Sequence, residues 1–176
     1  MGNLLVVYGV HIEETSFALK VKNAYLQRYG IHRNIHFCKV NGVAQDSNSE
    51  YFVYDEISAI VDKLKPDVIV DLHHSKGFDK MKISLDKSIE VDFMGSDLFR
   101  CSKYSELLAS LSFIGDNVYY KDPHDRFSDV LKTSPKTIYL QLEALLHGSQ
   151  NTFHNNAWNN GVKSRLVELL EQIRTA

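Results

Sequence analysis

Two side chains that can bind a metal, His11 and Glu14, follow a short apolar stretch near the start of the chain. Zn²⁺ accepts imidazole nitrogen and carboxylate oxygen together, and a catalytic zinc site usually has three protein ligands and one open position. The His-x-x-Glu spacing therefore predicts two ligands of such a site and requires a third from elsewhere. The alternative interpretation is a polar turn in front of a helix.

The candidate third ligand is His73, which follows the apolar run Val68–Leu72. It would complete a His-Glu-His set. Asp71 lies two residues earlier, and side chains two apart point to the same face of a strand, so its carboxylate could support and orient the imidazole of His73. His74 would point to the opposite face if the strand continues, and it is the rival ligand.

A candidate for proton transfer is Glu143, which interrupts the otherwise apolar stretch 140–146. Burying a carboxylate is costly unless a partner or a metal is close. A metal at the predicted site would lower the pKa of water toward neutrality and polarise a substrate carbonyl. If Glu143 faces that water, it can take the proton and deliver it to the leaving group. Together the four residues predict a hydrolytic site.

The elements that must position these residues alternate between strands and helices. The spacing of apolar residues and of turn formers predicts a strand at 3–8, a helix at 15–29 ended by Gly30 and a strand at 35–40. A helix from Ser49 to about Leu64 follows, and its apolar pattern predicts that Phe52, Ile57, Ile60, Val61 and Leu64 face inward. Strands at 68–72 and 137–142 and a helix at 161–173 complete the clear elements. Weaker patterns predict strands at 82–85, 89–93 and 117–120 and a helix at 96–111. This order indicates an α/β protein whose sheet has parallel strands and is covered on both faces. Functional groups at the carboxyl ends of parallel strands converge in one crevice, which is where sites form in such sheets.

The composition indicates a single globular domain over residues 1–176, with 44% hydrophobic and 24% charged residues. A net charge of -2 gives no electrostatic reason to expect binding to nucleic acid or to an anionic membrane. No apolar run approaches the roughly 20 residues that span a bilayer, and the N-terminus lacks the features of a signal peptide. Cys38 and Cys101 lack the CxxC spacing of metal or redox sites. We therefore expect reduced thiols and a cytoplasmic protein.

Three segments in the same order resemble a known superfamily. Gly9–Glu14 resembles a Gly-x-His-Gly-x-Glu element, Lys65–His73 resembles the strand that leads to a third zinc ligand, and Leu140–Glu143 resembles the strand that ends in a catalytic glutamate. The superfamily is that of the zinc carboxypeptidases and of aspartoacylase and succinylglutamate desuccinylase. The resemblance spans residues from about 4 to 147.

The resemblance implies a three-layer α/β/α sandwich with a mixed, mostly parallel central sheet, so that residues 1–176 would form one zinc-hydrolase-like domain. It also implies one Zn²⁺ per chain held by His11, Glu14 and His73. The implied reaction is hydrolysis of an amide bond, with Glu143 as general base and acid. The substrate would be an N-acylated amino acid or a small peptide.

The chain departs from the family pattern at three places. Ile12 replaces a glycine, and Glu13 replaces an asparagine. The segment 41–48 contains none of the arginines that bind a substrate carboxylate and help to stabilise the oxyanion in the family. Other side chains must then contact the substrate, and the candidates are Asn48, Lys76, Tyr119, Tyr120 and Arg126. The alternative is that these are solvated loop residues or packed aromatics.

The leading hypothesis is a small zinc-dependent amidohydrolase, either a deacylase or a peptidase. One rival is a non-catalytic domain that keeps the hydrolase fold, with or without the metal, and binds a ligand. A second rival is a metal-free α/β protein in which these residues are incidental. The sequence leaves the substrate, the oxyanion donor and the oligomeric state open.

Overall fold

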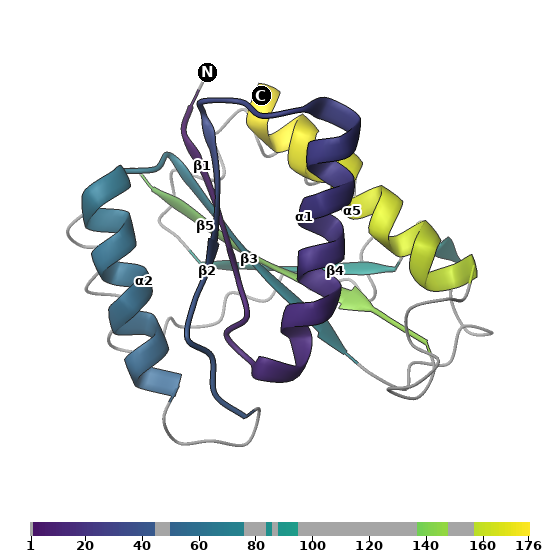
Figure 1. The fold of residues 1–176 in the computed structure, drawn as a ribbon, viewed down its shortest axis with the longest axis horizontal. Helices are drawn as coiled ribbons and strands as arrows, with labels where there is room; N and C mark the ends of the chain where they lie inside the picture. Colours follow the sequence, from purple (N-terminus) through teal and green to yellow (C-terminus); the bar gives the residue numbers. More distant parts are fainter. Residues whose placement is uncertain (1, 45–49, 76–83, 86–87, 95–136, 148–156) are drawn as a thin grey trace.

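The computed structural model describes residues 2–44, 50–75, 84–85, 88–94, 137–147 and 157–176 (Figure 1). All structural statements below concern these residues. The sequence-predicted features at 96–111 and 117–120, and Cys101, lie outside them, as do residues 82–83 of the strand predicted at 82–85.

Five strands of the described part form a sheet in the order β2-β1-β3-β5-β4. Neighbouring strands are parallel except for β4, which runs antiparallel to β5 at one edge. This arrangement confirms the expected mixed, mostly parallel sheet. The strands are β1 (Leu4–Tyr8), β2 (Ile35–Lys39), β3 (Val68–Ser75), β4 (Ile89–Met94) and β5 (Ile138–Leu145).

Helices cover both faces of the sheet and give three layers (Figure 1). The helices α1 (Thr15–Tyr29) and α5 (Ala157–Thr175) pack on one face, and α2 (Glu50–Leu64) packs on the other. Because successive side chains of a strand point to opposite faces of the sheet, each inner strand contributes residues to the hydrophobic cores on both faces. In β3, Val70 belongs to the core beneath α1 and α5, whereas Ile69 belongs to the core beneath α2.

The order of the strands reverses at β1. The chain passes from β1 through α1 to β2 on one side, and then through α2 on the opposite face to β3 on the other side of β1. A crevice forms where the connections to the two neighbours leave on opposite faces, at the carboxyl ends of the strands. The fold therefore places the ends of β1 and β3 at such a switch point.

Two expectations about β3 and α2 were wrong in detail. β3 runs to Ser75, so His73 lies inside the strand instead of after it, because pairing with β5 continues past the end of β1. Phe52 was expected to point inward but is 73% exposed. The buried face of α2 carries Val53, Ile57 and Val61, which are four residues apart on one side of the helix. Phe52 lies about 100° around the helix from Val53, beyond the edge of this face.

Candidate metal centre

The loop after β1 turns back on itself before it enters α1. Gly9 has φ of 85°, a conformation that glycine adopts without steric cost, and His11 is extended with φ of -103° and ψ of 131°. The short 3-10 helix η1 (Ile12–Glu14) follows and runs directly into α1. His11 and Glu14 therefore lie at the two ends of one turn, which explains why two ligands three residues apart can face the same point.

A second loop, after β2, holds this turn in place. The N–H of Ile12 donates to the carbonyl of Val43 at 3.0 Å, and the N–H of Val43 donates to the carbonyl of Val10 at 3.0 Å. The backbones approach so closely at Gly42 that an added Cβ would lie 1.8 Å from the carbonyl oxygen of Gly9. Only glycine fits at this position, so Gly42 is needed for the position of His11.

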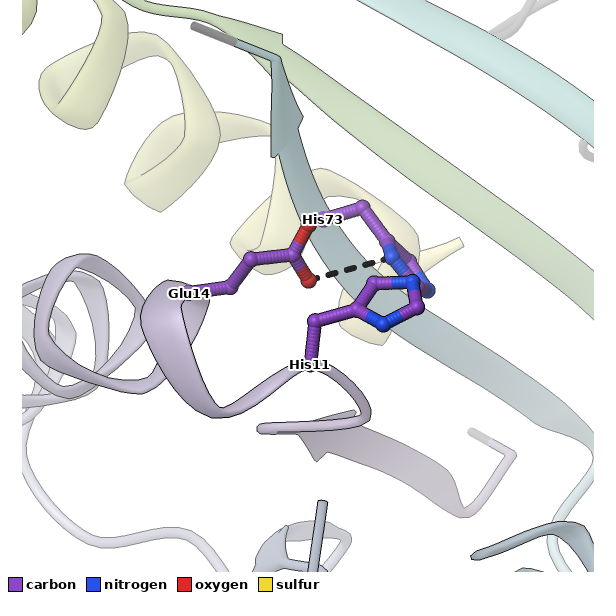
Figure 2. Close-up of side chains that lie close together, drawn as sticks. All are labelled: His11, Glu14 and His73. Carbon is purple, nitrogen blue, oxygen red and sulfur yellow. Dashed lines mark ion pairs between the residues drawn. The ribbon is translucent and has the colours of Figure 1, made fainter. Parts of the chain in front are cut away.

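The structure brings His11, Glu14 and His73 together (Figure 2). Each offers one ligand atom, and these atoms lie within 4.8 Å of one another. Nδ1 of His73 is 3.1 Å from Oε2 of Glu14, and the ring centroids of His11 and His73 are 5.3 Å apart. The other oxygen of Glu14 accepts a long hydrogen bond, 3.4 Å, from the backbone N–H of His74. One carboxylate oxygen is thus anchored while the other faces the two imidazoles.

These distances suit a single small cation. Two ligands bonded to zinc at about 2.0–2.2 Å with tetrahedral angles lie roughly 3.3–3.6 Å apart. The pair formed by Glu14 and His73 is already close to that separation, and the 4.8 Å limit for the set can be closed by small side-chain rotations. In the described residues no hydrogen-bond donor is aligned with Oε2 of Glu14, although the atom is buried. A buried carboxylate oxygen in this condition is a suitable metal ligand.

Charges around His73 oppose the effect of its burial. Burial alone would lower its pKa, but the charges of Asp71 and Glu14 and their contacts with the ring outweigh burial and raise the pKa well above 6.5. The site is therefore strongly attractive to positive charge, whether that charge is a proton or a metal ion.

Asp71 occupies the position expected of a supporting carboxylate. Its Oδ2 lies 2.9 Å from Nε2 of His73, on the opposite side of the ring from Glu14. The same oxygen accepts a short hydrogen bond from the hydroxyl of Tyr139 on β5. Burial, reinforced by the charge of Asp71, raises the pKa of Tyr139 well above 10.0, so this hydroxyl stays a neutral donor.

Glu143 lies next to His73 in the sheet. The two are register partners in the parallel pair of β3 and β5, and Glu143 is half-buried. Adjacent strands are about 4.8 Å apart, so the Glu143 side chain starts close to the cluster. Its role as a base stays a prediction. The rival ligand His74 lies on the other face, where its ring contacts Phe17 of α1 at a centroid distance of 6.0 Å.

The predicted substrate-contacting residues Asn48, Lys76, Tyr119, Tyr120 and Arg126 all lie outside the described residues. The sequence pattern predicts residue 139 only as part of a strand and does not indicate its contact with Asp71. A signal was present, because Tyr139, Gln141 and Glu143 alternate with the apolar residues of β5 and give one face of that strand polar groups.

No protein-family model matches the sequence, and no curated protein matches it. Among solved structures, the chain is similar to the apo 5'-methylthioadenosine nucleosidase of Arabidopsis thaliana, with 13% identity, a TM-score of 0.51, and coverage of 98% of this chain and 96% of that one. It is similar to the apo N-acetylmuramyl-L-alanine amidase of Mycobacterium abscessus, with 11% identity, a TM-score of 0.51, and coverage of 99% of both chains. An MTA/SAH nucleosidase matches at 11% identity and a TM-score of 0.50, over 98% of this chain and 96% of that one.

At these identities the likeness shows the fold, an α/β architecture that occurs in amidases and nucleosidases. Membership of the zinc carboxypeptidase superfamily stays a prediction. None of the helices in the described ranges has the length and apolar character needed to cross a membrane.

Proposed function

We propose that this protein is a zinc-dependent amidohydrolase that cleaves the amide bond of an N-acylated amino acid or a small peptide. The observation that supports the proposal is the cluster of His11, Glu14 and His73, whose ligand atoms lie within 4.8 Å of one another at the switch point of the sheet. In open α/β sheets, small-molecule ligands bind at this place.

The donor set favours zinc over magnesium and calcium. Two imidazole nitrogens and one carboxylate oxygen match the His₂Glu set of catalytic zinc, which leaves one coordination position for solvent or substrate. Magnesium and calcium prefer oxygen ligands alone, and structural zinc sites usually close the shell with cysteines. Cys38, on the edge strand β2, does not belong to the cluster.

The proposed chemistry divides between the metal and Glu143. Zinc in this position would supply a Lewis acid that lowers the pKa of water and polarises the substrate carbonyl. Glu143, next to His73 in the register, would accept the proton of the attacking water and pass it to the leaving nitrogen. Asp71 and Glu14 contact opposite nitrogens of His73 and would hold its ring in one orientation.

The amide bond is favoured over other bonds by the site and not by the fold. The fold occurs in an N-acetylmuramyl-L-alanine amidase, which supports an acyl-amino acid amide as substrate, but it also occurs in nucleosidases. The metal-capable cluster is the feature that favours hydrolysis of a carbonyl compound, because a metal stabilises the charge that develops on the carbonyl oxygen.

The proposal is tested with protein purified without a metal-binding tag. We expect about one zinc per chain by elemental analysis, and loss of this zinc in His73→Ala. His36→Ala is the matched control, because it removes a half-buried histidine from β2, outside the cluster, and should keep the metal. Zinc-loaded protein should hydrolyse at least one member of a panel of N-acyl-amino acids and short peptides.

Two results would contradict the proposal in different ways. Equal zinc content in His73→Ala and the unaltered protein would remove His73 from the metal site. Tight binding of an acyl-amino acid without turnover would instead identify a non-catalytic binding domain that keeps the fold and the metal.

A further inference from the structure

Two buried tyrosines in this protein donate their hydroxyl groups to carboxylates. Tyr139 on β5 donates to Oδ2 of Asp71, and Tyr25 on α1 donates to Oε2 of Glu171 on α5 at 2.6 Å. Both tyrosine side chains are fully buried. Only the first of these carboxylates contacts a residue of the candidate metal centre.

The contacts form a continuous chain from the interior of the sheet to the cluster. Oδ2 of Asp71 receives the hydroxyl of Tyr139 and also lies 2.9 Å from Nε2 of His73, a contact that is close in distance but is not aligned as a hydrogen bond. On the other side of the ring, Nδ1 of His73 lies 3.1 Å from Oε2 of Glu14. Asp71 is fully buried, and in the described residues its second oxygen, Oδ1, has no hydrogen-bond partner. The Tyr139 hydroxyl is thus the donor on β5 that fixes this carboxylate.

We propose that Tyr139 is a positioning residue of the metal centre, which acts through Asp71 to keep Nε2 of His73 protonated and Nδ1 directed at the metal. This inference rests on the proposed metal centre. In a neutral imidazole one nitrogen carries the proton and the other offers its lone pair, and the partner of the first decides which one binds the metal. A carboxylate held on one side of the ring therefore selects the nitrogen on the other side.

The geometry assigns this role to Tyr139 because β3 and β5 hold the two side chains on one face. Tyr139 is the register partner of Ile69, and Asp71 lies two residues further along β3 on the same face. Without the hydroxyl, Asp71 would keep its charge but lose a buried donor, and its carboxylate could rotate away from His73. The cost would appear as weaker metal binding, since ligand orientation is part of metal affinity.

Tyr139→Phe tests this role, with Tyr25→Phe as the matched control. Each variant removes one hydroxyl that donates to a carboxylate, but only the first is connected to the cluster. Zinc affinity is measured by competition with a chromophoric chelator. We expect it to fall about tenfold in Tyr139→Phe, the lower end of the range for residues that support a metal ligand without touching the metal. It should stay unchanged in Tyr25→Phe. Denaturant unfolding of the metal-free proteins separates this effect from a general loss of stability.

A double-variant comparison tests whether Tyr139 acts through Asp71. Asp71→Asn should weaken zinc binding by about 10–100-fold, and adding Tyr139→Phe to it should weaken binding no further, because the two residues act as one unit. As a spectroscopic readout, ¹⁵N chemical shifts of the zinc-loaded protein should show Nδ1 of His73 bound to the metal and Nε2 protonated, and this preference should weaken in Tyr139→Phe.

Three outcomes would overturn the inference and leave the metal centre intact: unchanged zinc affinity in Tyr139→Phe, an equal loss of affinity in Tyr25→Phe, or fully additive losses in the double variant. If the unaltered protein binds no zinc, the proposed function itself fails, and the inference fails with it.

Discussion

Gly42 provides a sharp test of how the protein positions His11. A Cβ at this residue would lie 1.8 Å from the carbonyl oxygen of Gly9 and 2.7 Å from that of Val10. Both obstacles are backbone atoms, which cannot rotate away as a side chain could. Gly42→Ala must therefore push apart the loops that follow β1 and β2.

The cost of this separation follows from the contacts that it breaks. Two backbone hydrogen bonds join the loops, between Ile12 and Val43 and between Val43 and Val10, and each contributes roughly 0.5–1.5 kcal/mol net. Forcing an extra methyl group into packed surroundings costs about 1–3 kcal/mol more. We expect Gly42→Ala to lower the free energy of unfolding by about 2–6 kcal/mol. For a chain of this length the melting temperature should fall by roughly 4–24 °C.

The measurement is thermal and denaturant unfolding of the metal-free protein, followed by a zinc titration. Zinc affinity should fall as well, because the displaced loop carries His11. Gly30→Ala is the control. Gly30 also has positive φ, at 79°, with ψ of -167°, a conformation essentially restricted to glycine, so alanine is strained there by about 1–3 kcal/mol. Its Cβ would meet no atom within 4 Å, and we expect zinc affinity to be unchanged. Wild-type stability in Gly42→Ala would refute the reasoning, as would a large loss of stability with undiminished zinc affinity.

Two further predictions concern the base and the interface of the helices. Glu143→Gln should keep zinc and lower turnover about 10²–10⁴-fold, as expected for loss of a general base, and undiminished turnover in a substrate assay would reject the assignment. Hydrogen bonds from Arg174 lower the pKa of Glu171, although the partial burial of the carboxylate opposes this effect. The stability that the carboxylate contributes is therefore fully present above its ordinary pKa of 4.5. It is lost as the pH falls through the lowered pKa of the folded protein. Glu171→Gln should therefore flatten the loss of stability below about pH 4.5 in denaturant unfolding, and an unchanged acid dependence would contradict the role of this pair.

The sequence predicted much of the fold because its signals are local. Continuous apolar residues at Leu4–Tyr8 and Val68–Leu72 indicated buried strands, and Gly30 ends α1 as expected, with its φ of 79°. The error at Phe52 arose because an aromatic residue at the start of an amphipathic helix was assigned to the buried face, whereas contacts with the sheet select Val53. Local pattern alone could not decide between adjacent positions.

The candidate site was partly predictable for the same reason. His11, Glu14 and His73 were predicted because each follows an apolar run in the sequence, and the carboxyl ends of the strands meet at a switch point. The contribution of Tyr139 was not found, because it depends on the register between β3 and β5, which no local pattern specifies. The close approach of Gly42 to the backbone of Gly9 was not predicted either, because contact between two loops is visible only in three dimensions.

The central claim is that one metal ion binds between His11, Glu14 and His73. The most direct measurement is a crystal structure of the zinc-loaded protein with anomalous diffraction at the zinc edge. We expect one strong peak per chain at about 2.0–2.2 Å from Nδ1 of His73, Oε2 of Glu14 and a ring nitrogen of His11. No peak at this cluster in the presence of saturating zinc, or a peak held only by other residues, would contradict it.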